Sequence, residues 1–497
     1  MNSKNLLYLV SGNIDLSNIS DFEVKGITNN SKNVKDGYIF VAIRGYKDDG
    51  NVFIQNAVEN GALMIVTDKL ELRFLKEKFP KEGLSFVKVE NSRRFMALLS
   101  NEFYAEPSKK IKLIGITGTN GKTTTAYLIK KIIEACGYRC GLLGTVDYDF
   151  GSSKIKSSLT TPESFQINSM LNEMLKMGYE YCVMEVSSIA LMLERVYGMS
   201  FSGAAYTNLS PEHLDLHRDM EDYFKAKKIL FDMLSEKSTA VSNLDDDYGF
   251  RIITGSKGKK YFYGIDKNCD YKASDIRIDM NGLEFVIIDR QNIFKIKSSL
   301  TGRFNVYNIL AAYSLCVNLN LDVNMIIKGI EEFKPVKGRF DKILLPNGAY
   351  AVIDYSHTSD SLKNAIEAAI DIRNNQNKKG KIITIFGCGG NKDKMKRPVM
   401  GKYSTTLSDV TIITSDNPRY EEPKDIIADI LKGVKSDSEF EVIENREDAI
   451  RKGISISGNS DIILICGKGH ETYQEVKGVR TDFDDYEIVK KYSQLVK

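Results

Sequence analysis

The sequence predicts an α/β protein of three domains. Its 497 residues exceed what one hydrophobic core usually serves, since domains typically hold about 100 to 200 residues. Short apolar runs alternate with helical patterns along the chain, which is typical of parallel sheets covered by helices. At residues 113–125, an apolar run leads through a glycine-rich turn into a helix, as in phosphate-binding folds. We place the domains at residues 1–108, 109–335 and 336–497.

The first domain shows the alternation clearly. GYIFVAI (37–43) predicts a strand, residues 51–62 predict a helix with Gly61 near its end, and LMIVTD (63–68) predicts the next strand. The polar segment YAEPSKKIKL predicts a linker to the second domain, and KPVKGRFD (334–341) predicts the second boundary.

The other two domains repeat one sequence pattern, an apolar strand-like run. KLIGIT, YCVMEV and GAAYTNL in the second domain are strand-like, and the helical pattern TTTAYLIKKIIEACG follows the first of them. In the third domain, YAVIDYSH, KIITIFGCGG, DVTIITSDNPR and DIILICGKGHE are apolar strands that end in polar or glycine-rich loops. We therefore expect doubly wound parallel sheets, whose ligands bind beyond the carboxyl ends of the strands.

Composition excludes several classes of protein. With 69 basic and 66 acidic side chains, the net charge of +3 argues against nucleic-acid binding and polybasic membrane contact. No apolar stretch approaches the about 18 residues of a transmembrane helix, and the first residues lack a signal-peptide pattern. The 7 cysteines are scattered without a CxxC pair, as in a reducing cytosol. We expect a cytoplasmic monomer without nucleic-acid partners or membrane insertion.

The 4 histidines indicate an enzyme. His213, His217, His357 and His470 each lie in a short polar segment beside Gly, Asp, Glu, Asn or Lys. Such residues gather at sites more than in cores.

The glycine-rich turn predicts a phosphate loop. Gly118 and Gly121 let backbone N–H groups approach phosphate oxygens, Lys122 can pair with the β- and γ-phosphates, and the Thr123 hydroxyl can bind Mg²⁺. Ile116 stands where the general GxxxxGK[ST] motif has its first glycine. We expect ATP to contact Gly118, Thr119, Asn120, Gly121, Lys122, Thr123 and Thr124.

Two further residues suit a divalent cation. Glu185 ends one predicted strand and His213 follows another, so both can face the phosphate loop. A carboxylate and an imidazole suit an ion that lies among triphosphate oxygens and waters. Taken alone, they would also fit a strand-end carboxylate and a packing residue.

GTNGKTTT after a strand resembles the phosphate loop of the Mur ligase family, the ATP-dependent amino-acid ligases of peptidoglycan precursor synthesis. The shorter motif is that family's form, and the resemblance runs from SKNVKDGYIFVAIRG to GKGHETYQ. It implies an N-terminal UDP-binding α/β domain, a central P-loop ATPase-type parallel-sheet domain and a C-terminal Rossmann-like domain. It also implies that ATP and two Mg²⁺ ions serve a reaction in which UDP-MurNAc-L-Ala-D-Glu gains a diamino acid through an acyl phosphate.

The same resemblance assigns roles to residues. YFKAKKILF (223–231) matches the pattern around a carbamylated lysine, so CO₂ would convert Lys227 into a carboxylate-like ligand. The implied catalytic residues are Lys122, Lys227, Arg339 and His213. The implied metal ligands are Thr123, Glu185, His213 and Lys227. Further nucleotide contacts would be Asn305, Asn308, Asp354 and His357.

The remaining implied contacts concern the other substrates. Ser31 and the loop 45–50 would meet the UDP-sugar, and Thr160, Thr161, Ser187 and Arg195 the muramoyl peptide. The diamino acid would meet Lys392, Asp416, Asn417, Pro418, Arg419, Gly467 and Glu471. In the family, Asp-Asn-Pro-Arg marks enzymes that add meso-diaminopimelate. Arg419 can bind its distal carboxylate in a bidentate manner, and Glu471 can accept an ammonium.

Three positions depart from the family's usual pattern: Ile189 replaces His, Leu193 replaces Gln and Lys392 replaces Arg. Lysine keeps the charge but lacks the planar fork of arginine, so L-lysine or another diamino acid remains an alternative. A folylpolyglutamate-synthase-like ligase is a further alternative, which the UDP-site resemblance and the Arg419 loop oppose. A nucleotide-binding regulatory protein is the non-enzyme alternative, which the intact phosphate-loop and metal residues oppose.

Overall fold

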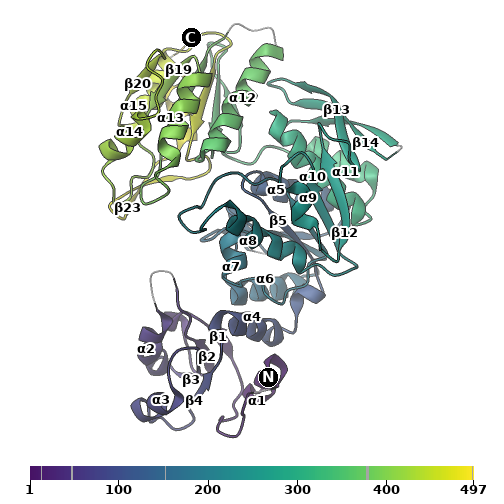
Figure 1. Cartoon of the computed structure of the whole chain (residues 1–497), viewed down its shortest axis with the longest axis vertical. Helices are drawn as coiled ribbons and strands as arrows, with labels where there is room; N and C mark the ends of the chain where they lie inside the picture. Colours follow the sequence, from purple (N-terminus) through teal and green to yellow (C-terminus); the bar gives the residue numbers. More distant parts are fainter. Residues whose placement is uncertain are drawn as a thin grey trace.

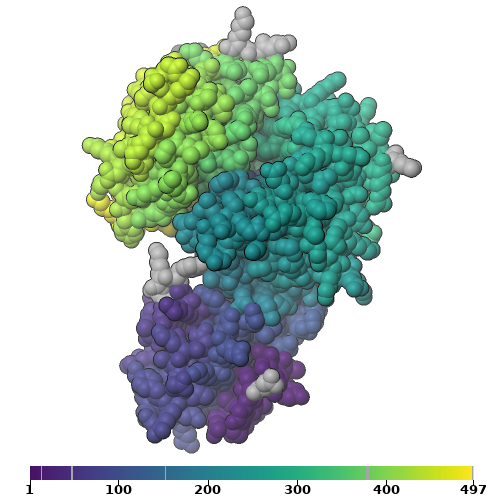
Figure 2. Space-filling model, viewed as in Figure 1, coloured from purple at the N-terminus to yellow at the C-terminus, as the bar shows by residue number. Residues whose placement is uncertain are grey.

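The computed structural model describes residues 1–12, 14–45, 49–151, 153–290, 292–375, 380–494 and 496. Three sheets divide the chain, as the predicted three-domain α/β class requires. Figure 1 shows the N-terminal domain at the bottom, the central domain above it and the C-terminal domain at the upper left. In the space-filling view of Figure 2, the C-terminal domain lies against the central domain. Residues 46–48 of the loop expected at the UDP-sugar lie outside the described residues.

The N-terminal domain holds a four-stranded parallel sheet, in which neighbours in sequence are neighbours in space. Its strands are β1 (Gly26–Thr28), β2 (Tyr38–Val41), β3 (Ala62–Thr67) and β4 (Ser85–Lys88). Its helices are α1 (Ser3–Val10), η1 (Ser31–Asn33), η2 (Gly50–Phe53), α2 (Ile54–Glu59), α3 (Leu72–Lys78) and α4 (Ser92–Phe103). The two strands predicted here are confirmed, and the predicted helix is divided into η2 and α2.

The central domain holds an 11-stranded sheet in the order β15-β14-β13-β12-β11-β10-β5-β9-β6-β7-β8. Its strands are β5 (Lys112–Thr117), β6 (Cys140–Leu143), β7 (Asp147–Asp149), β8 (Lys154–Lys156), β9 (Tyr181–Glu185), β10 (Gly203–Tyr206), β11 (Thr239–Asn243), β12 (Lys259–Gly264), β13 (Tyr271–Ile278), β14 (Leu283–Asp289) and β15 (Asn292–Ser298). The middle is parallel, as predicted. Both edges are antiparallel, which the sequence analysis did not foresee.

Helices cover both faces of this sheet. They are η3 (Pro107–Lys109), α5 (Lys122–Ala135), α6 (Ser164–Lys176), α7 (Ser188–Met192), α8 (Met220–Asp232), α9 (Gly249–Ile253), α10 (Arg303–Asn318) and α11 (Val323–Glu332). α5, α10 and α11 bury their apolar side chains in one core, and α6, α8 and α9 bury theirs in the other. Burial on both faces explains why the parallel strands read as continuous apolar runs.

The C-terminal domain holds a sheet in the order β16-β17-β21-β18-β19-β20. Its strands are β16 (Asp341–Leu344), β17 (Tyr350–Asp354), β18 (Ile382–Phe386), β19 (Val410–Ile413), β20 (Phe440–Val442) and β21 (Ile462–Cys466), and β22 (Tyr473–Val476) and β23 (Val479–Asp482) form a separate hairpin. The helices are α12 (Ser359–Asn375), α13 (Lys396–Leu407), α14 (Pro423–Leu431), α15 (Arg446–Ser455) and α16 (Asp485–Ser493). Within the six-stranded sheet, all strands but β16 are parallel, and the β22–β23 hairpin is antiparallel. Because β21 lies between β17 and β18, the strand order reverses there, and ligands bind at such points.

The structure also bears on the cysteines and on membrane-spanning helices. The cysteines are all free thiols, as expected. None of the helices within the described residues combines the length and the apolar character needed to span a bilayer.

A buried ion pair stabilises the C-terminal domain. Arg446 donates to both carboxylate oxygens of Asp485, at 2.8 and 2.7 Å, and both side chains are 0% exposed. Because Asp485→Ala leaves a buried charge without a partner, we expect it to lower the free energy of unfolding of this domain by about 3–5 kcal/mol. Denaturant unfolding measures the change.

The matched control is Glu441→Ala, which removes an exposed ion pair with Lys452 in the same domain. It should cost less than about 1 kcal/mol. Equal unfolding midpoints for Asp485→Ala and Glu441→Ala would contradict the stabilising role of the buried pair.

Candidate active site

A cavity of about 760 Å³ lies between the central and C-terminal domains, at the carboxyl ends of their parallel strands. Most of the predicted site residues line it: Thr119, Asn120, Gly121, Lys122, Thr123, Thr124, Thr160, Glu185, His213, Asn308, Arg339, Asp354, His357, Lys392, Asp416, Asn417, Arg419, Gly467 and Glu471. The other predicted residues lie behind this lining or outside the cavity. One cavity therefore joins the phosphate loop to the loop that carries Arg419.

The phosphate loop connects β5 to α5 and can be built only with its two glycines. Gly118 has φ 151°, and a Cβ there would lie 1.9 Å from the Thr207 hydroxyl oxygen. Gly121 has φ 85°, and a Cβ there would lie 2.4 Å from Asn308 Oδ1. Side chains at either position would push these neighbours away, so the glycines fix how closely β10 and α10 approach the loop.

Two lysines meet at the carbonyl oxygen of Gly118. The Nζ atoms of Lys122 and Lys227 each donate to it at 2.9 Å. Lys227, on α8, is 1% exposed. Burial lowers the pKa of both amines, and for Lys227 the nearby charge of Lys122 lowers the pKa further. Lys227 is thus a buried amine whose surroundings favour its neutral, nucleophilic form.

The start of α5 suits a magnesium ion. Glu185 is 0% exposed, and its Oε2 accepts hydrogen bonds from the hydroxyls of Thr123 and Thr145, both at 3.0 Å. Arg339 Nη2 donates to the same Thr123 hydroxyl at 3.1 Å. Within the described ranges, no three His, Cys, Asp or Glu side chains form a metal cluster by themselves. Nucleotide sites usually complete Mg²⁺ with phosphate oxygens and water, so this hydroxyl–carboxylate pair fits the ion.

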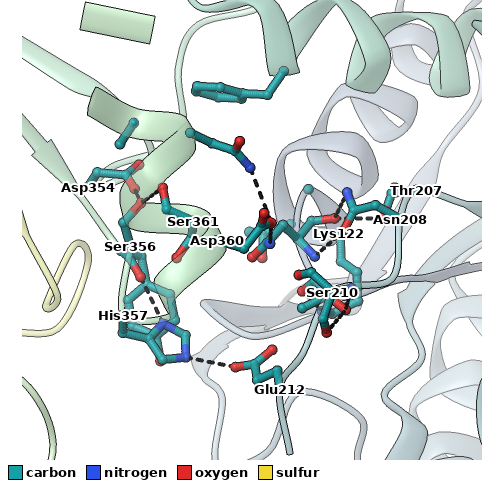
Figure 3. A pocket seen from close by; sticks show the side chains of 18 of the residues that line it. Lys122, Thr207, Asn208, Ser210, Glu212, Asp354, Ser356, His357, Asp360 and Ser361 are labelled. Carbon is teal, nitrogen blue, oxygen red and sulfur yellow. Dashed lines mark hydrogen bonds and ion pairs between the residues drawn. The ribbon is translucent and has the colours of Figure 1, made fainter. Parts of the chain in front are cut away.

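Glu212 is a central residue that the sequence analysis missed. Its Oε1 lies 3.3 Å from His357 Nε2, and its Oε2 lies 3.8 Å from His213 Nε2; Figure 3 shows Glu212 reaching across the cavity to His357. Burial alone would raise the pKa of Glu212, but His357, His213 and Lys122 outweigh burial and hold the pKa below its usual range. Burial lowers the pKa of His213 to about 4. Glu212 directly precedes the predicted metal ligand His213 in the sequence, and this position could have indicated its place in the site.

Tyr223 packs against Lys227 and His217 and was also missed. Its ring lies 4.4 Å from Lys227 Nζ and 4.7 Å from the ring of His217. His217 lies 3.0 Å from the Ser188 hydroxyl through its Nε2. The buried His217 and Tyr223 thus link α7 to the helix that carries Lys227.

Asn120 is held by residues from both domains. Its backbone N–H donates to Asn208 Oδ1 at 2.9 Å, and its carbonyl accepts from the Thr207 hydroxyl at 2.6 Å. Its side chain donates to Asp360 Oδ2 at 3.0 Å, on α12 of the C-terminal domain. Asn208, Thr207 and Asp360 line the same cavity (Figure 3). This contact and the Glu212–His357 contact join the two domains across the cavity.

The residues expected near the nucleotide divide into two layers. Asn308 lines the cavity, whereas Asn305 is 2% exposed and lies behind it, accepting from Asn308 Nδ2 at 2.8 Å. Asp354 accepts from the backbone N–H of Phe340 at 2.7 Å. The guanidinium of Arg339 lies 4.4 Å from the ring centre of Tyr355, so this ring orients Arg339 toward Thr123.

The residues expected at the muramoyl peptide form a cluster beside the end of β9. The Thr161 hydroxyl donates to Glu185 O at 2.8 Å and accepts from Ser187 N at 3.0 Å. Arg195 donates to Thr161 O at 3.0 Å and pairs with Glu163 at 2.8 Å. Of the predicted peptide residues, Thr160 alone lines the cavity. Ser31 begins η1 in the N-terminal domain, so the structure does not bring it to this cavity.

The far end of the cavity carries both signs of charge. Asn417 donates to Glu471 Oε2 at 2.8 Å, and Arg419 Nη1 donates to Gly390 O at 2.9 Å.

Burial and the Asp416 charge raise the pKa of Glu471, whereas burial and the Arg419 charge lower the pKa of Lys392. Pro418 packs closely on the adjoining loop, because a Cβ on Gly390 would lie 1.9 Å from its carbonyl oxygen. Two acids and two bases in one pocket suit a zwitterionic ligand.

Comparisons with known families cover most of the chain. Residues 23–104 match the "Mur ligase family, catalytic domain", residues 116–316 the "Mur ligase middle domain" and residues 338–469 the "Mur ligase, glutamate ligase domain".

Relatives of nearly the same length are also known. The chain is 41% identical over 484 residues to a UDP-N-acetylmuramoyl-L-alanyl-D-glutamate–2,6-diaminopimelate ligase of Clostridium tetani, covering 97% of this chain and 96% of that protein. It is 41% identical over 472 residues to the ligase of the same name from Clostridium botulinum, covering 94% of each. A solved structure of a ligase with this name superposes with a TM-score of 0.65 at 30% identity, covering 95% of this chain and 94% of that one.

The phosphate loop supports a direct test. Because a Cβ on Gly118 would meet the Thr207 hydroxyl, we expect Gly118→Ala to weaken ATP binding by at least about tenfold. Calorimetric titration of ATP into the purified protein measures the change. Gly458→Ala is the control, since its Cβ would meet nothing nearer than Asp461 Oδ2 at 3.8 Å. Unchanged affinity in a folded Gly118→Ala protein would remove this loop from the nucleotide site.

Proposed function

The chain belongs to the Mur ligase family and is an ATP-dependent amide-forming ligase, and we propose that it joins meso-diaminopimelate to UDP-MurNAc-L-Ala-D-Glu. The observation that carries the proposal is the single cavity that holds a phosphate loop at one end and paired acids and bases at the other. The names of the relatives at 41% identity support the same substrates.

The reaction follows from this arrangement in two steps. The terminal carboxylate of the nucleotide peptide attacks the γ-phosphorus of ATP, so that an acyl phosphate forms and ADP leaves. The acceptor amine then attacks the acyl carbon, forms the amide, releases phosphate and gives up a proton. Lys122 and Arg339 lie next to Thr123 and stabilise charge on the transferred phosphoryl group. Closure of the two domains around the substrates would protect the acyl phosphate from water.

Magnesium completes the nucleotide end. Thr123, Glu185, His213 and a carbamylated Lys227 would hold two Mg²⁺ ions, whose positive charge neutralises the triphosphate. Carbamylation joins the neutral Lys227 amine to CO₂ with loss of one proton. The burial of Lys227 next to Lys122 supports this modification, because a negative carbamate beside Lys122 replaces a repulsion by an attraction.

The acceptor pocket favours diaminopimelate over the alternatives. Arg419 and Lys392 offer positive charge to a distal carboxylate, and Glu471 and Asp416 offer negative charge to an ammonium. L-Lysine has no distal carboxylate and would leave the positive charges of Arg419 and Lys392 without an anionic group of the ligand, so it should bind less tightly than diaminopimelate. A glutamate acceptor, as in folylpolyglutamate synthesis, would leave the two acids without a distal ammonium.

We also propose that the enzyme is a cytoplasmic monomer. The free thiols suit a reducing compartment, which supports the cytoplasmic location. The function is tested by incubating the protein with ATP, the nucleotide dipeptide and either meso-diaminopimelate or L-lysine, and by measuring product mass. ATP hydrolysis that proceeds at one rate with and without an amino acid would overturn the proposal.

Arg419 tests the acceptor. Because it would donate charge-assisted hydrogen bonds to the distal carboxylate, Arg419→Ala should raise the KM for meso-diaminopimelate by about 10- to 100-fold. Arg419→Lys should give an intermediate KM, since lysine keeps the charge without the fork. Steady-state kinetics with each acceptor measure the effect. A loss of equal size with L-lysine would show that Arg419 does not recognise the distal carboxylate.

Lys227 tests the carbamate. With ¹³C-labelled bicarbonate, the wild-type protein should show a carbamate signal by ¹³C NMR, and Lys227→Ala should lose both that signal and at least about 100-fold in kcat. Lys225→Ala, an exposed lysine on the same helix, is the control and should keep both. A signal that survives in Lys227→Ala would place the carbamate on another lysine.

A further inference from the structure

A buried lysine lies directly beneath the acceptor pocket. Lys468 is 0% exposed and follows β21 between two glycines with left-handed backbones, Gly467 at φ 121° and Gly469 at φ 53°. Neither glycine has room for a side chain: a Cβ on Gly467 would lie 3.1 Å from Asp416 Oδ2, and one on Gly469 would lie 2.6 Å from Gly338 O. The loop is thus shaped so that Lys468 points into the protein rather than into the cavity.

The ammonium of Lys468 contacts groups that carry the predicted acceptor residues. It donates to Asn417 Oδ1 at 2.9 Å and to Tyr473 O at 2.7 Å, and it lies 3.4 Å from Asp416 Oδ1. An ammonium has three donors and no acceptor. Two of these donors bond to Asn417 and Tyr473, and the ammonium lies at ion-pair distance from the Asp416 carboxylate. Lys468 is not among the described residues that line the cavity.

These contacts decide how the Asn417 side chain is oriented. Its Oδ1 accepts from Lys468 Nζ and, at 3.0 Å, from the backbone N–H of Glu475. Two donors on one side force the oxygen to face them, so the amide nitrogen must face the other way. There it donates to Glu471 Oε2 at 2.8 Å. This contact fixes Glu471 and leaves its second oxygen for a ligand.

Lys468 also balances the charge of Asp416, which has no other cation within ion-pair distance among the described residues. The buried pair of Arg446 and Asp485 lies near enough for its charges to act on Lys468. These two buried cations and two buried anions balance one another. Without Lys468, the group would carry an excess negative charge near Glu471.

We propose that Lys468 is a positioning residue for the acceptor amino acid, acting through the amide of Asn417 and the carboxylate of Asp416. The inference rests on the proposed function for the identity of the acceptor. It assigns Lys468 no contact with substrate and no part in phosphoryl transfer. Its loss should therefore weaken binding of the diamino acid and leave the nucleotide end unchanged.

The test replaces the lysine by a neutral side chain of similar length. Lys468→Met should raise the KM for meso-diaminopimelate, and its Kd by calorimetric titration, by at least about tenfold. The KM values for ATP and for the nucleotide dipeptide should change by less than about twofold. Lys477→Met, an exposed lysine on the neighbouring β-turn, is the control and should keep all three values. A folded Lys468→Met protein with an unchanged acceptor KM, or with all three KM values raised alike, would overturn the inference.

A second comparison covers the case in which a lone buried Asp416 prevents folding. Asp416→Asn and Asp416→Asn/Lys468→Met differ only at position 468, and neither leaves Asp416 as an unpaired charge. We expect the acceptor KM of the double variant to exceed that of Asp416→Asn by at least about threefold, because Asn417 loses one of its two donors. Equal values would mean that Lys468 only neutralises Asp416 and would overturn the inference. Turnover by the wild-type protein tests the proposed function. The ratio of the acceptor KM of the double variant to that of Asp416→Asn tests the role of Lys468.

Discussion

The carbonyl oxygen of Gly118 is the point on which the active site depends. It accepts hydrogen bonds from Lys122 and Lys227, and two buried ammonium groups cannot share one oxygen without strong repulsion. Burial lowers the pKa of both amines, and the charge of Lys122 lowers the pKa of Lys227 further. Under the proposed function, Lys122 would stay positive to meet phosphates and Lys227 would be the amine that gives up its proton. Carbamylation, as proposed, would then turn Lys227 from a donor into an acceptor. Gly118 would lose one hydrogen bond, and Lys122 would gain a negative neighbour.

The same oxygen constrains elements far away in the chain. A side chain at position 118 would collide with Thr207, which directly follows β10. Tyr223 and His217 pack α8, which carries Lys227, against α7. The C-terminal domain is joined to this region by Glu212 and Asp360. The residues proposed to bind magnesium, the phosphate loop and the contact between the central and C-terminal domains are thus parts of one packed unit.

Local patterns in the sequence predicted the strands and the phosphate loop, because each is a short run of residues with its own chemistry. The role of the Arg419 loop came from the family resemblance. The antiparallel edge of the central sheet was missed, although Asn281-Gly282 between β13 and β14 is a typical hairpin turn. Glu212 and Lys468 were missed for another reason. Their roles come from contacts with His357 and Asn417, which are distant in sequence, and no single segment shows such a contact.

The order of the predicted sites agrees with the order of groups along the substrates. Ser31 lies in the N-terminal domain, α7 lies in the lower part of the central domain, toward the N-terminal domain, in Figure 1, and the phosphate loop and the Arg419 loop line the cavity. α4 of the N-terminal domain is anchored beside the peptide cluster through the ion pair of Arg94 with Glu194, at 2.6 Å. Under the proposed function, a nucleotide peptide bound with its uridine near Ser31 would extend past α7 and present its terminal carboxylate to Lys122. The acceptor, held by charges above Lys468, would then meet that carboxylate from the opposite side.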